Sequence, residues 1–258
     1  DPSPRLLGVS ASGRVALIRW EFAGQQPGSL EKFLPSGLDG DPLIAITQLP
    51  TGDGEELSLG LLSSDGRFKR LPLTEVLDLS GRATSMVKLK EGVRLCSAVI
   101  CHEHSDLVLV SSMGRLLRLP VNDSVLPKMG RLAQGPMTMR LLPGEELVGS
   151  LAMNVAETDP TLLLVSRHGQ MTRIDLTPLR RCQRGDLGMM AVHLSSDEDS
   201  VVGLCSGDVL AGIVTDQKRH GRLDAAAVEL AAAGKTWSDQ LDLNSKEKVV
   251  SVVALQTL

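Results

Sequence analysis

The sequence predicts an all-β fold of five blades with about four strands each, and two observations lead to that prediction. One phrase recurs five times: an apolar run, one or two small polar residues, a glycine usually followed by a basic residue, and a second apolar run. The turn glycines of the five copies lie 53, 48, 55 and 52 residues apart; they are Gly13, Gly66, Gly114, Gly169 and Gly221. A hairpin-based period near fifty residues is typical of propellers and related arrays of blades.

The third copy shows the expected strands of one blade most clearly. Residues 107–110 form a continuous apolar run, as in a strand covered on both faces, and 111–114 form a hairpin turn whose glycine can adopt a positive φ. Residues 116–121 form the returning strand. The alternating segment 137–141 and the apolar segment 147–152 supply a third and a fourth strand.

The other copies follow this order with differences at the two ends of the chain. Copies two and four place their third strands at 86–89 and 189–192, whereas the first copy has one clear strand, 43–46, after its loop. The fifth copy has a longer hairpin, 216–222, and an Ala-rich stretch, 225–233, that predicts a short helical turn. We expect one domain, 1–258, whose blades span approximately 5–56, 57–106, 107–158, 159–208 and 209–258.

The composition is sufficient for a substantial hydrophobic core built from aliphatic residues. The charge is unevenly distributed along the chain. Hydrophobic residues make up 42% of the chain and aromatic residues 2%, so Leu and Val must fill the core. The net charge is −4, but residues 61–185 carry a balance of +5 and the remainder −9. The distribution of charge is more informative than its sum, because a local basic surface attracts polyanions even on an acidic protein.

Several features bear on where the protein works. No apolar stretch reaches the roughly 18 residues of a membrane helix, and the chain opens on Asp1 without Met, which suggests a domain cut from a longer protein. The four cysteines, Cys96, Cys101, Cys182 and Cys205, lack paired-motif spacing and indicate reduced thiols. We therefore expect a cytoplasmic protein without contact to a membrane.

The pattern of the third copy, read as a whole, resembles one known family. Its parts are Leu107 to Arg115, then Gly130-Arg131-Leu132-Ala133-Gln134-Gly135, then Gly144 to Val148. This combination resembles a blade of the C-terminal domain of the A subunit of bacterial DNA gyrase and of topoisomerase IV. The second and fourth copies fit the same pattern.

The resemblance implies a β-pinwheel, a relative of the propeller whose blades exchange strands, with DNA bent around a basic rim. The partners that it implies are duplex DNA, the rest of the A subunit and, through it, the ATPase B subunit, so the resemblance also implies a nucleoid-associated protein. Gyrase-type members carry a Gln-Arg-Arg-Gly-Gly-Lys-Gly box in the first blade, but the loop at 35–40 is acidic here and the nearest match is 183–188 in copy four. That departure puts chirally constrained wrapping in doubt.

No catalytic role is expected of this chain by itself. It contains no Tyr, the residue through which type IIA topoisomerases cut DNA, and no phosphate-binding GxxxxGK[ST] loop. We expect no cofactor. A zinc site at Cys101-His102-Glu103-His104 matches no standard ligand spacing, and His168, His193 and His220 are scattered.

The basic residues are the candidate DNA-binding site, because several recur at the same place in successive copies. Arg14, Arg67, Arg115 and Arg222 follow the turn glycine directly, and Arg70, Arg118 and Arg173 stand four positions after it, where the end copies have Leu17 and Ala225. The predicted set also includes cations of the strands and second loops; in full it is Arg67, Lys69, Arg70, Arg82, Arg115, Arg118, Lys128, Arg131, Arg173, Arg180, Arg181 and Arg184.

Cations repeated in step with the blades would form an arc along which phosphates bind and release counterions. The alternative is that they only solvate the blade edges and discourage edge pairing. Under the first hypothesis, reversing Arg67, Arg70, Arg115, Arg118 and Arg173 to Glu should abolish bending and leave the circular dichroism unchanged.

The sequence thus favours non-sequence-specific binding and bending of duplex DNA that presents it for strand passage. A protein-interaction propeller is the alternative, favoured by the acidic total charge. Base-specific recognition is disfavoured because no recognition helix is evident. The sequence leaves open whether the parent is gyrase or topoisomerase IV, whether a sixth blade exists, whether the ring closes, the handedness of a wrap and the oligomeric state.

Overall fold

The computed structural model describes residues 5–18, 20, 29–51, 54–77, 79, 81–153, 159–231 and 237–255. These residues form two compact units. Unit 1 comprises residues 1–105 and 120–138, and unit 2 comprises residues 106–119 and 139–258. No helix in the described part of the chain is long and apolar enough to cross a bilayer. Asp1, on which the expectation of a domain cut from a longer protein depends, lies outside the described residues.

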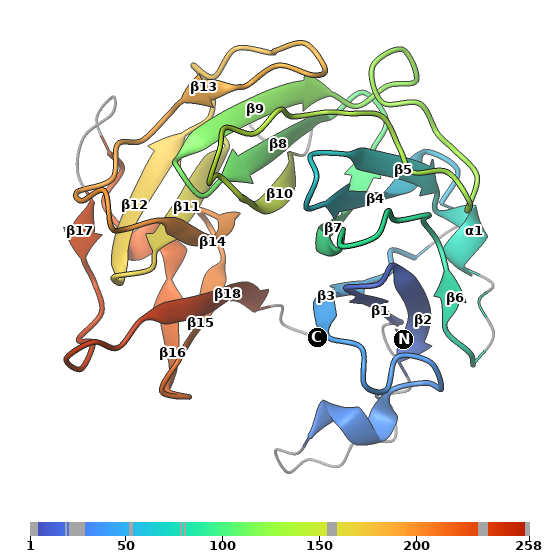
Figure 1. The fold of residues 1–258 in the computed structure, drawn as a ribbon, viewed down its shortest axis with the longest axis horizontal. Helices are drawn as coiled ribbons and strands as arrows, with labels where there is room; N and C mark the ends of the chain where they lie inside the picture. The colour runs from blue at the N-terminus through green and yellow to red at the C-terminus, as the bar shows by residue number, and fades with distance from the viewer. Residues whose placement is uncertain are drawn as a thin grey trace. The chain divides into compact units, whose positions relative to one another are not determined.

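The fold is all-β, as predicted, and its blades are sheets of three or four antiparallel strands (Figure 1). Five such sheets are present in the described residues, ordered β3-β1-β2-β6, β5-β4-β7, β10-β8-β9-β13, β14-β11-β12-β17 and β16-β15-β18. We number them blades 1 to 5 in that order. Blades 1 and 2 belong to unit 1, and blades 3 to 5 belong to unit 2.

The strands of unit 1 are β1 (Leu6–Ser10), β2 (Arg14–Ile18), β3 (Leu43–Gln48), β4 (Leu57–Ser63), β5 (Phe68–Pro72), β6 (Thr84–Ser85) and β7 (Leu95–His102). Those of unit 2 are β8 (Asp106–Ser111), β9 (Arg115–Pro120), β10 (Leu147–Met153), β11 (Thr161–Ser166), β12 (Gln170–Asp175), β13 (Met189–Met190), β14 (Val201–Ser206), β15 (Leu210–Thr215), β16 (His220–Asp224), β17 (Ser238–Asp239) and β18 (Val249–Leu255). The short helices are α1 (Thr74–Leu77), η2 (Leu30–Phe33) and η3 (Ala225–Ala227). The Ala-rich stretch is thus helical only at η3, and Ala232 and Ala233 lie outside the described residues.

The central strands of each blade form the core. Their side chains are apolar on both faces because both faces of the sheet are covered by other parts of the protein. All residues of β8 are buried, as predicted from its continuous apolar run. Unit 1 has a core of Leu and Val around Leu59, Leu61 and Leu71. Unit 2 has two such clusters, one around Val108 and Leu164 and one around Leu163 and Ile213. Aliphatic side chains therefore fill the interior.

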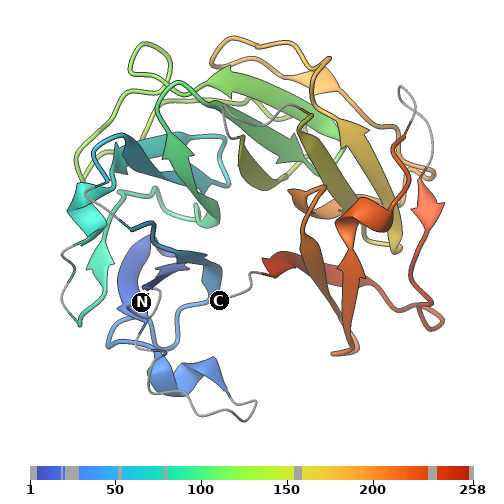
Figure 2. The same cartoon turned by 180° about the vertical axis from the view of Figure 1, so that it is seen from behind.

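The blades exchange strands, and this is what the family resemblance implies for a pinwheel. Strand β13 follows the β11–β12 hairpin in sequence but pairs with β9 of blade 3, where Met189 lies opposite Leu116. Strand β6 pairs in the same way with β2, and β17 with β12. In blade 2 a single bridge between Arg67 and Met137 takes this place. We call β6, β13 and β17 the donated strands, and the Met137 bridge takes their place in blade 2. Figure 2 shows the ribbon of Figure 1 from behind.

The donated strands are shorter than the third strands predicted from sequence. Only two residues pair in β6 and β13, and the predicted strand at 86–89 follows β6 instead of coinciding with it. Within unit 1 the Phe68 N–H donates to the Pro136 carbonyl and the Thr138 N–H to the Gly66 carbonyl. The alternating segment 137–141 was predicted to be a five-residue strand, but it pairs with the blade 2 hairpin through one or two residues only.

The fifth hairpin turn lies three residues earlier than predicted. In the third repeat, the Gly114 N–H donates to the Ser111 carbonyl and the Arg115 N–H donates to Ser111 Oγ at 3.1 Å. In the fifth repeat, Lys218 and Arg219 make the same two bonds to Thr215. Lys218 has a φ of 61° and occupies the place of the turn glycine.

Gly221 therefore lies in strand β16 rather than in the turn, and the fifth hairpin is no longer than the others. The residue four positions after the turn residue is consequently Arg222, not Ala225. The sequence did not indicate this register, because the turn position was predicted from glycine. Lys218 is not a glycine, yet it adopts a positive φ at a steric cost.

Candidate nucleic-acid interface

The arginines four positions after the turn act as clamps between consecutive repeats. Arg70 Nε donates to the Leu126 carbonyl at 2.7 Å, and Arg118 Nη1 donates to the Leu176 and Leu179 carbonyls at 3.1 and 3.0 Å. Arg173 Nη1 donates to the Ala226 carbonyl at 2.6 Å. Each acceptor lies in the loop after the second strand of the next repeat. We call Arg70, Arg118 and Arg173 the clamp arginines.

In blade 2 the clamp arginine is fully neutralised by carboxylates. The Arg70 side chain has 0% exposure and pairs with Glu103 at 2.8 Å and Asp123 at 2.5 Å. Lys128 Nζ lies 2.6 Å from the same Glu103 carboxylate. Burial raises the pKa of Glu103, but the hydrogen bonds from Lys128 and Arg70 outweigh burial and hold that pKa below its ordinary value. The group formed by these four residues carries no net charge.

The same arrangement recurs in blade 3 around a single carboxylate. Asp106 accepts from Arg118 Nε at 2.8 Å and from Arg181 Nε at 2.9 Å. Arg118 and Arg181 also form a parallel bridge, as Arg70 and Lys128 do. The structure thus brings two pairs of predicted residues together, each pair on one carboxylate.

In blade 4 no carboxylate of the described residues pairs with the clamp arginine. The bridge partner of Arg173 is Leu230, at the place that Lys128 and Arg181 occupy in the earlier repeats. Arg173 Nε is buried without a hydrogen-bond partner among the described residues. Arg173 is partly buried and keeps more of its charge uncompensated than Arg70 or Arg118.

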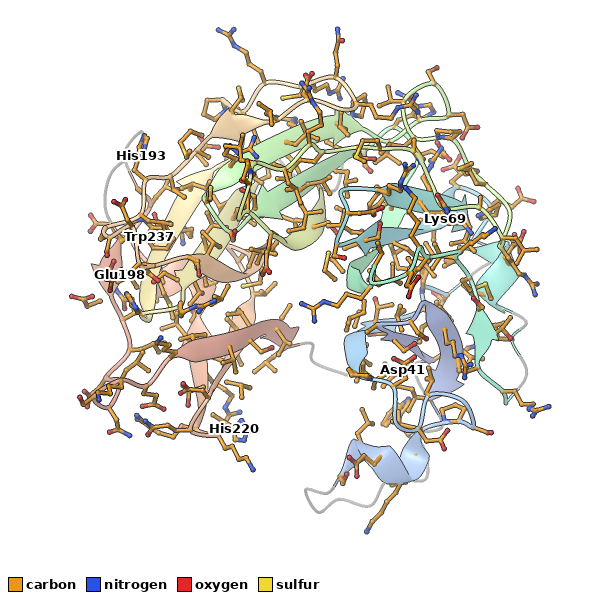
Figure 3. The ribbon with its side chains drawn as sticks, viewed as in Figure 1. Asp41, Lys69, His193, Glu198, His220 and Trp237 are labelled. Carbon is orange, nitrogen blue, oxygen red and sulfur yellow. The ribbon has the colours of Figure 1, made fainter. Side chains whose placement is uncertain are left out.

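The side chains of Arg115 and Lys69 are buried and form their hydrogen bonds inside the protein. Arg115 makes a two-pronged ion pair with Glu145, with Nε to Oε1 at 2.9 Å, and also donates to the Leu187 carbonyl. Burial raises the pKa of Glu145, but hydrogen bonds from Arg115 and the Leu142 N–H hold that pKa below its ordinary value. Lys69 Nζ donates to the Met86 carbonyl at 2.5 Å and the Arg131 carbonyl at 2.7 Å, and burial lowers its pKa to about 8 (Figure 3).

Arg67 is half-buried and is held by local partners. Its Nη1 donates to the Gly135 carbonyl at 3.0 Å. Its Nε lies 3.3 Å from Asp65 but without hydrogen-bond geometry. The arginine directly after the turn therefore braces the donated segment in blade 2, as Arg115 does in blade 3.

These contacts change the expected result of charge reversal. A glutamate at position 70 would be buried beside Glu103 and Asp123, one at position 115 would be buried beside Glu145, and an unpaired buried charge strongly destabilises the fold. We therefore expect reversal at these two positions to lower the stability of the fold, in place of leaving the circular dichroism unchanged. In blades 2, 3 and 4 the arginine repeated four positions after the turn makes the same internal contact.

The predicted cations that remain accessible lie on the loops after the second strands. Arg131 pairs with Glu75 at 2.9 Å and keeps 47% exposure, and Arg181 keeps 57%. Lys128 keeps 25%. The other exposed members of the predicted set are Arg82, Arg180 and Arg184. We call Arg82, Arg131, Arg180, Arg181 and Arg184 the loop cations.

Sequence reasoning missed several functional contributors. The carboxylates Glu103, Asp106 and Glu145 determine which cations are neutralised, yet the sequence gives no sign of these long-range pairs. Arg222 was assigned to the position directly after the turn glycine, and Lys218 to no repeated position, because the turn register was wrong. Aligning the buried Ser or Thr that precedes each turn, instead of the glycine, would have placed Arg222 in register with Arg70.

The segment Cys101-His102-Glu103-His104, considered for zinc, has other contacts. Cys101 is buried, which raises the pKa of its thiol to about 12, and Glu103 binds the two cations described above. The described residues contain no group of three or more His, Cys, Asp or Glu side chains placed to hold a metal ion. The four cysteines are free thiols.

Unit 2 also contains an apolar groove of about 390 Å³. It is lined mainly by aliphatic and thioether side chains, among them Leu116, Met190 and Leu230, with Asp175 as its carboxylate. This lining resembles a surface for apolar side chains more than a site with converging acid and base groups.

Comparison with known proteins identifies the family of this fold and these loops. The family model described as the DNA gyrase C-terminal domain, β-propeller, matches residues 61–102, 105–152 and 160–204, together just over half of the chain. The chain belongs to this family, the C-terminal domains of the A subunits of type IIA topoisomerases. The match covers repeats two to four, in which the clamp arginines lie.

Relatives come from both branches of these topoisomerases. The chain is 27% identical over 177 residues to the A subunit of DNA gyrase from Mycolicibacterium smegmatis, an alignment that covers 69% of this chain and 21% of that protein. It is 31% identical over 211 residues to the A subunit of DNA topoisomerase 4 from Synechocystis, covering 75% of this chain and 23% of that protein. The chain therefore spans about a fifth of the length of the curated relatives it matches.

Solved structures show the same fold. A DNA gyrase A C-terminal domain aligns with a TM-score of 0.81 at 22% identity, covering 98% of this chain and 82% of that chain. The C-terminal domain of a DNA topoisomerase IV aligns with a TM-score of 0.79 at 16% identity, covering 98% and 79%. The matches are to the C-terminal domain of the A subunit, not to its catalytic region.

Proposed function

We propose that this domain binds duplex DNA without sequence specificity, bends it, and presents it for strand passage by the rest of a type IIA topoisomerase A subunit, which works with an ATPase B subunit. The observation that carries the proposal is the set of loop cations that stay exposed while two of the clamp arginines, Arg70 and Arg118, pair with carboxylates. Phosphate contacts of this kind give affinity and position but carry no sequence information.

Bending explains why several loops are needed. Smooth bending of a duplex over some tens of base pairs costs on the order of 1–6 kcal/mol, so several phosphate contacts must offset it. Loop cations occur in both units, with Arg82 and Arg131 in unit 1 and Arg180, Arg181 and Arg184 in unit 2. Each unit therefore carries exposed cations that can contribute phosphate contacts toward this energy.

The experiment that tests the proposal measures affinity for a random-sequence duplex by fluorescence anisotropy over a range of salt concentrations. We expect log affinity to fall linearly with log salt, with a slope of about −0.9 for each phosphate neutralised. The triple variant Arg131→Gln, Arg180→Gln and Arg184→Gln should reduce that slope by about 3. Arg94→Gln, an exposed arginine in the turn before β7, is the matched control.

Bending has its own measurement. Plasmid relaxed by a topoisomerase in the presence of the domain should retain supercoils if DNA is wrapped, and their sign gives the handedness. Absence of binding to duplex, or binding that ignores both salt and the triple variant, would contradict the proposed function.

A protein-interaction module is the second candidate, and the apolar groove of unit 2 is the observation that favours it. Its exposed rim includes Met190 and Leu230, with 48% and 45% exposure. Changing Met190 and Leu230 to Ser should then abolish capture of the rest of the topoisomerase while leaving duplex affinity unchanged. The two candidates are thus separated by independent variants.

A further inference from the structure

One of the loop cations of unit 2, Arg184, lies in a tight turn that closes on itself. The Asp186 N–H donates to the Gln183 carbonyl at 3.2 Å, and the Gln183 N–H donates to Asp186 Oδ2 at 2.8 Å. Gly185 has a φ of 87°, which glycine adopts without steric cost. The turn therefore exposes the Arg184 side chain while its own backbone is hydrogen-bonded. We call residues 183–186 the Arg184 turn.

Two arginines of the preceding repeat hold the backbone of this turn and of the residue after it. Arg140 Nε donates to the Gly185 carbonyl at 2.6 Å, and the Arg140 N–H donates to the Asp186 carbonyl at 3.0 Å. Arg115 Nη1 donates to the Leu187 carbonyl. Three consecutive carbonyls thus accept hydrogen bonds from the third repeat.

Unit 1 holds a corresponding turn, 130–133, by a different side chain. The Ala133 N–H donates to the Gly130 carbonyl at 3.1 Å and closes the turn around Arg131. Buried Lys69 donates from Nζ to the Arg131 carbonyl at 2.7 Å (Figure 3). In both units an exposed loop arginine therefore lies in a turn whose carbonyl accepts from a cationic side chain.

Lys88 of unit 1 occupies the place of Arg140 but leaves its turn to Lys69. The Lys88 N–H donates to the Ala133 carbonyl at 3.2 Å, which matches the backbone bond of Arg140. The Lys88 side chain is exposed and makes no hydrogen bond or ion pair within the described part of the chain. Lys88 and Arg140 thus share a backbone contact, and only the Arg140 side chain binds the turn.

The exposed charge of Arg140 allows two interpretations. No carboxylate of the described residues pairs with Arg140, so its guanidinium could itself contact a phosphate. Its Nε is already used by the Gly185 carbonyl, however, and this bond orients the planar guanidinium toward the turn. A turn that is ordered before binding does not have to be ordered on binding, and this raises affinity.

We propose that Arg140 is a positioning residue for Arg184: its side chain holds the Arg184 turn in one conformation, and Arg184, not Arg140, contacts the phosphate. The bond from Arg140 Nε to the Gly185 carbonyl carries this inference. The inference rests on the proposed function and adds to it a residue that acts on duplex binding without touching the duplex.

The test is a double-mutant cycle on the full chain, with the affinity for a random-sequence duplex measured at several salt concentrations. Arg184→Gln should reduce the salt slope by about 1, because one phosphate contact is lost. Arg140→Gln alone should lower affinity about tenfold, which corresponds to ordering roughly one residue of backbone on binding. In the Arg184→Gln background, Arg140→Gln should have no further effect, because the turn then has no contact to position.

A matched control and a measurement without DNA complete the test. Lys88→Gln, at the same position of unit 1, should change affinity by the same factor with and without Arg131→Gln. In the free protein, Arg140→Gln should speed hydrogen exchange of the Asp186 amide, which closes the turn, and leave the thermal unfolding midpoint unchanged.

The other outcomes overturn the proposal in distinguishable ways. If Arg140→Gln lowers affinity by the same factor in both backgrounds, Arg140 contacts DNA itself. If it changes neither affinity nor exchange of the Asp186 amide, Arg140 does not order the turn. In both cases the proposed function stands. If the unmodified chain does not bind duplex, the proposed function fails, and the positioning role fails with it.

Discussion

Blades 2 and 5 each carry an arginine four positions after the turn residue, but one side chain is buried and the other is exposed. Arg70 is buried, donates to the Leu126 carbonyl and is neutralised by Glu103 and Asp123. Arg222 is exposed and has no partner among the described residues. The difference is that Arg70 holds the loop of the third repeat, whereas no loop in the described part of the chain accepts a hydrogen bond from Arg222. Repetition of a residue therefore indicates a structural contact before it indicates a ligand contact.

The largest expected effect concerns the most buried ion pair of the molecule's middle repeats. Arg115→Ala should lower the free energy of unfolding by about 3–5 kcal/mol, because Glu145 would remain buried without its partner. Urea unfolding at neutral pH measures this. Replacing both residues, Arg115→Met with Glu145→Leu, should restore much of the loss. A loss as small as that of the exposed Arg94→Ala control would refute this assignment.

The next prediction compares the two clamp positions directly. Arg70→Gln should lower the free energy of unfolding by about 1–3 kcal/mol, because Glu103 and the Leu126 carbonyl lose a charged donor. Arg222→Gln should change it by less than about 0.5 kcal/mol, as expected of a surface residue without partners. Equal losses at both positions would show that the blades do not differ in the way described.

The alkaline pH dependence of blade 2 should depend on Lys69. Burial lowers the folded-state pKa of Lys69 to about 8, below the unfolded value near 10.5. Below pH 8 both states hold the proton and the burial cost is present in full. Between about pH 8 and 10.5 the folded state releases its proton first, so stability rises with pH relative to the Lys69→Met variant. Thermal unfolding across this range measures it; parallel profiles would contradict the assignment.

The smallest effect concerns the backbone of the fifth turn. Lys218→Gly should raise the free energy of unfolding by up to about 1 kcal/mol, because glycine adopts the φ of 61° without steric cost. Gly66→Ala, at the same place in blade 2 with a φ of 88°, should lower it. A loss of stability would mean that the Lys218 side chain has a structural contact.

Much of the fold is determined by residues close together in the sequence and was therefore predictable. The apolar runs and Ser–x–x–Gly turns of repeats one to four predicted β1, β4, β8 and β11 and their hairpins, because the turn conformation depends on neighbouring residues only. The Leu- and Val-rich core followed from composition. The fifth turn was misplaced because Lys218 adopts a glycine-like φ, which no local pattern reveals.

The sequence by itself determined that this chain is a repeated β-hairpin protein with cations phased to its repeats, since periodicity and turn chemistry act over a few residues. Only the tertiary structure decided which cations are accessible, because Glu103, Asp106 and Glu145 reach their arginines across 12 to 33 positions of the chain. The folding of each blade brings Glu103 and Glu145 to arginines of their own repeat, and contacts between repeats add Asp123 of the next repeat to Arg70, so neutralisation depends on pairings that sequence neighbours do not reveal.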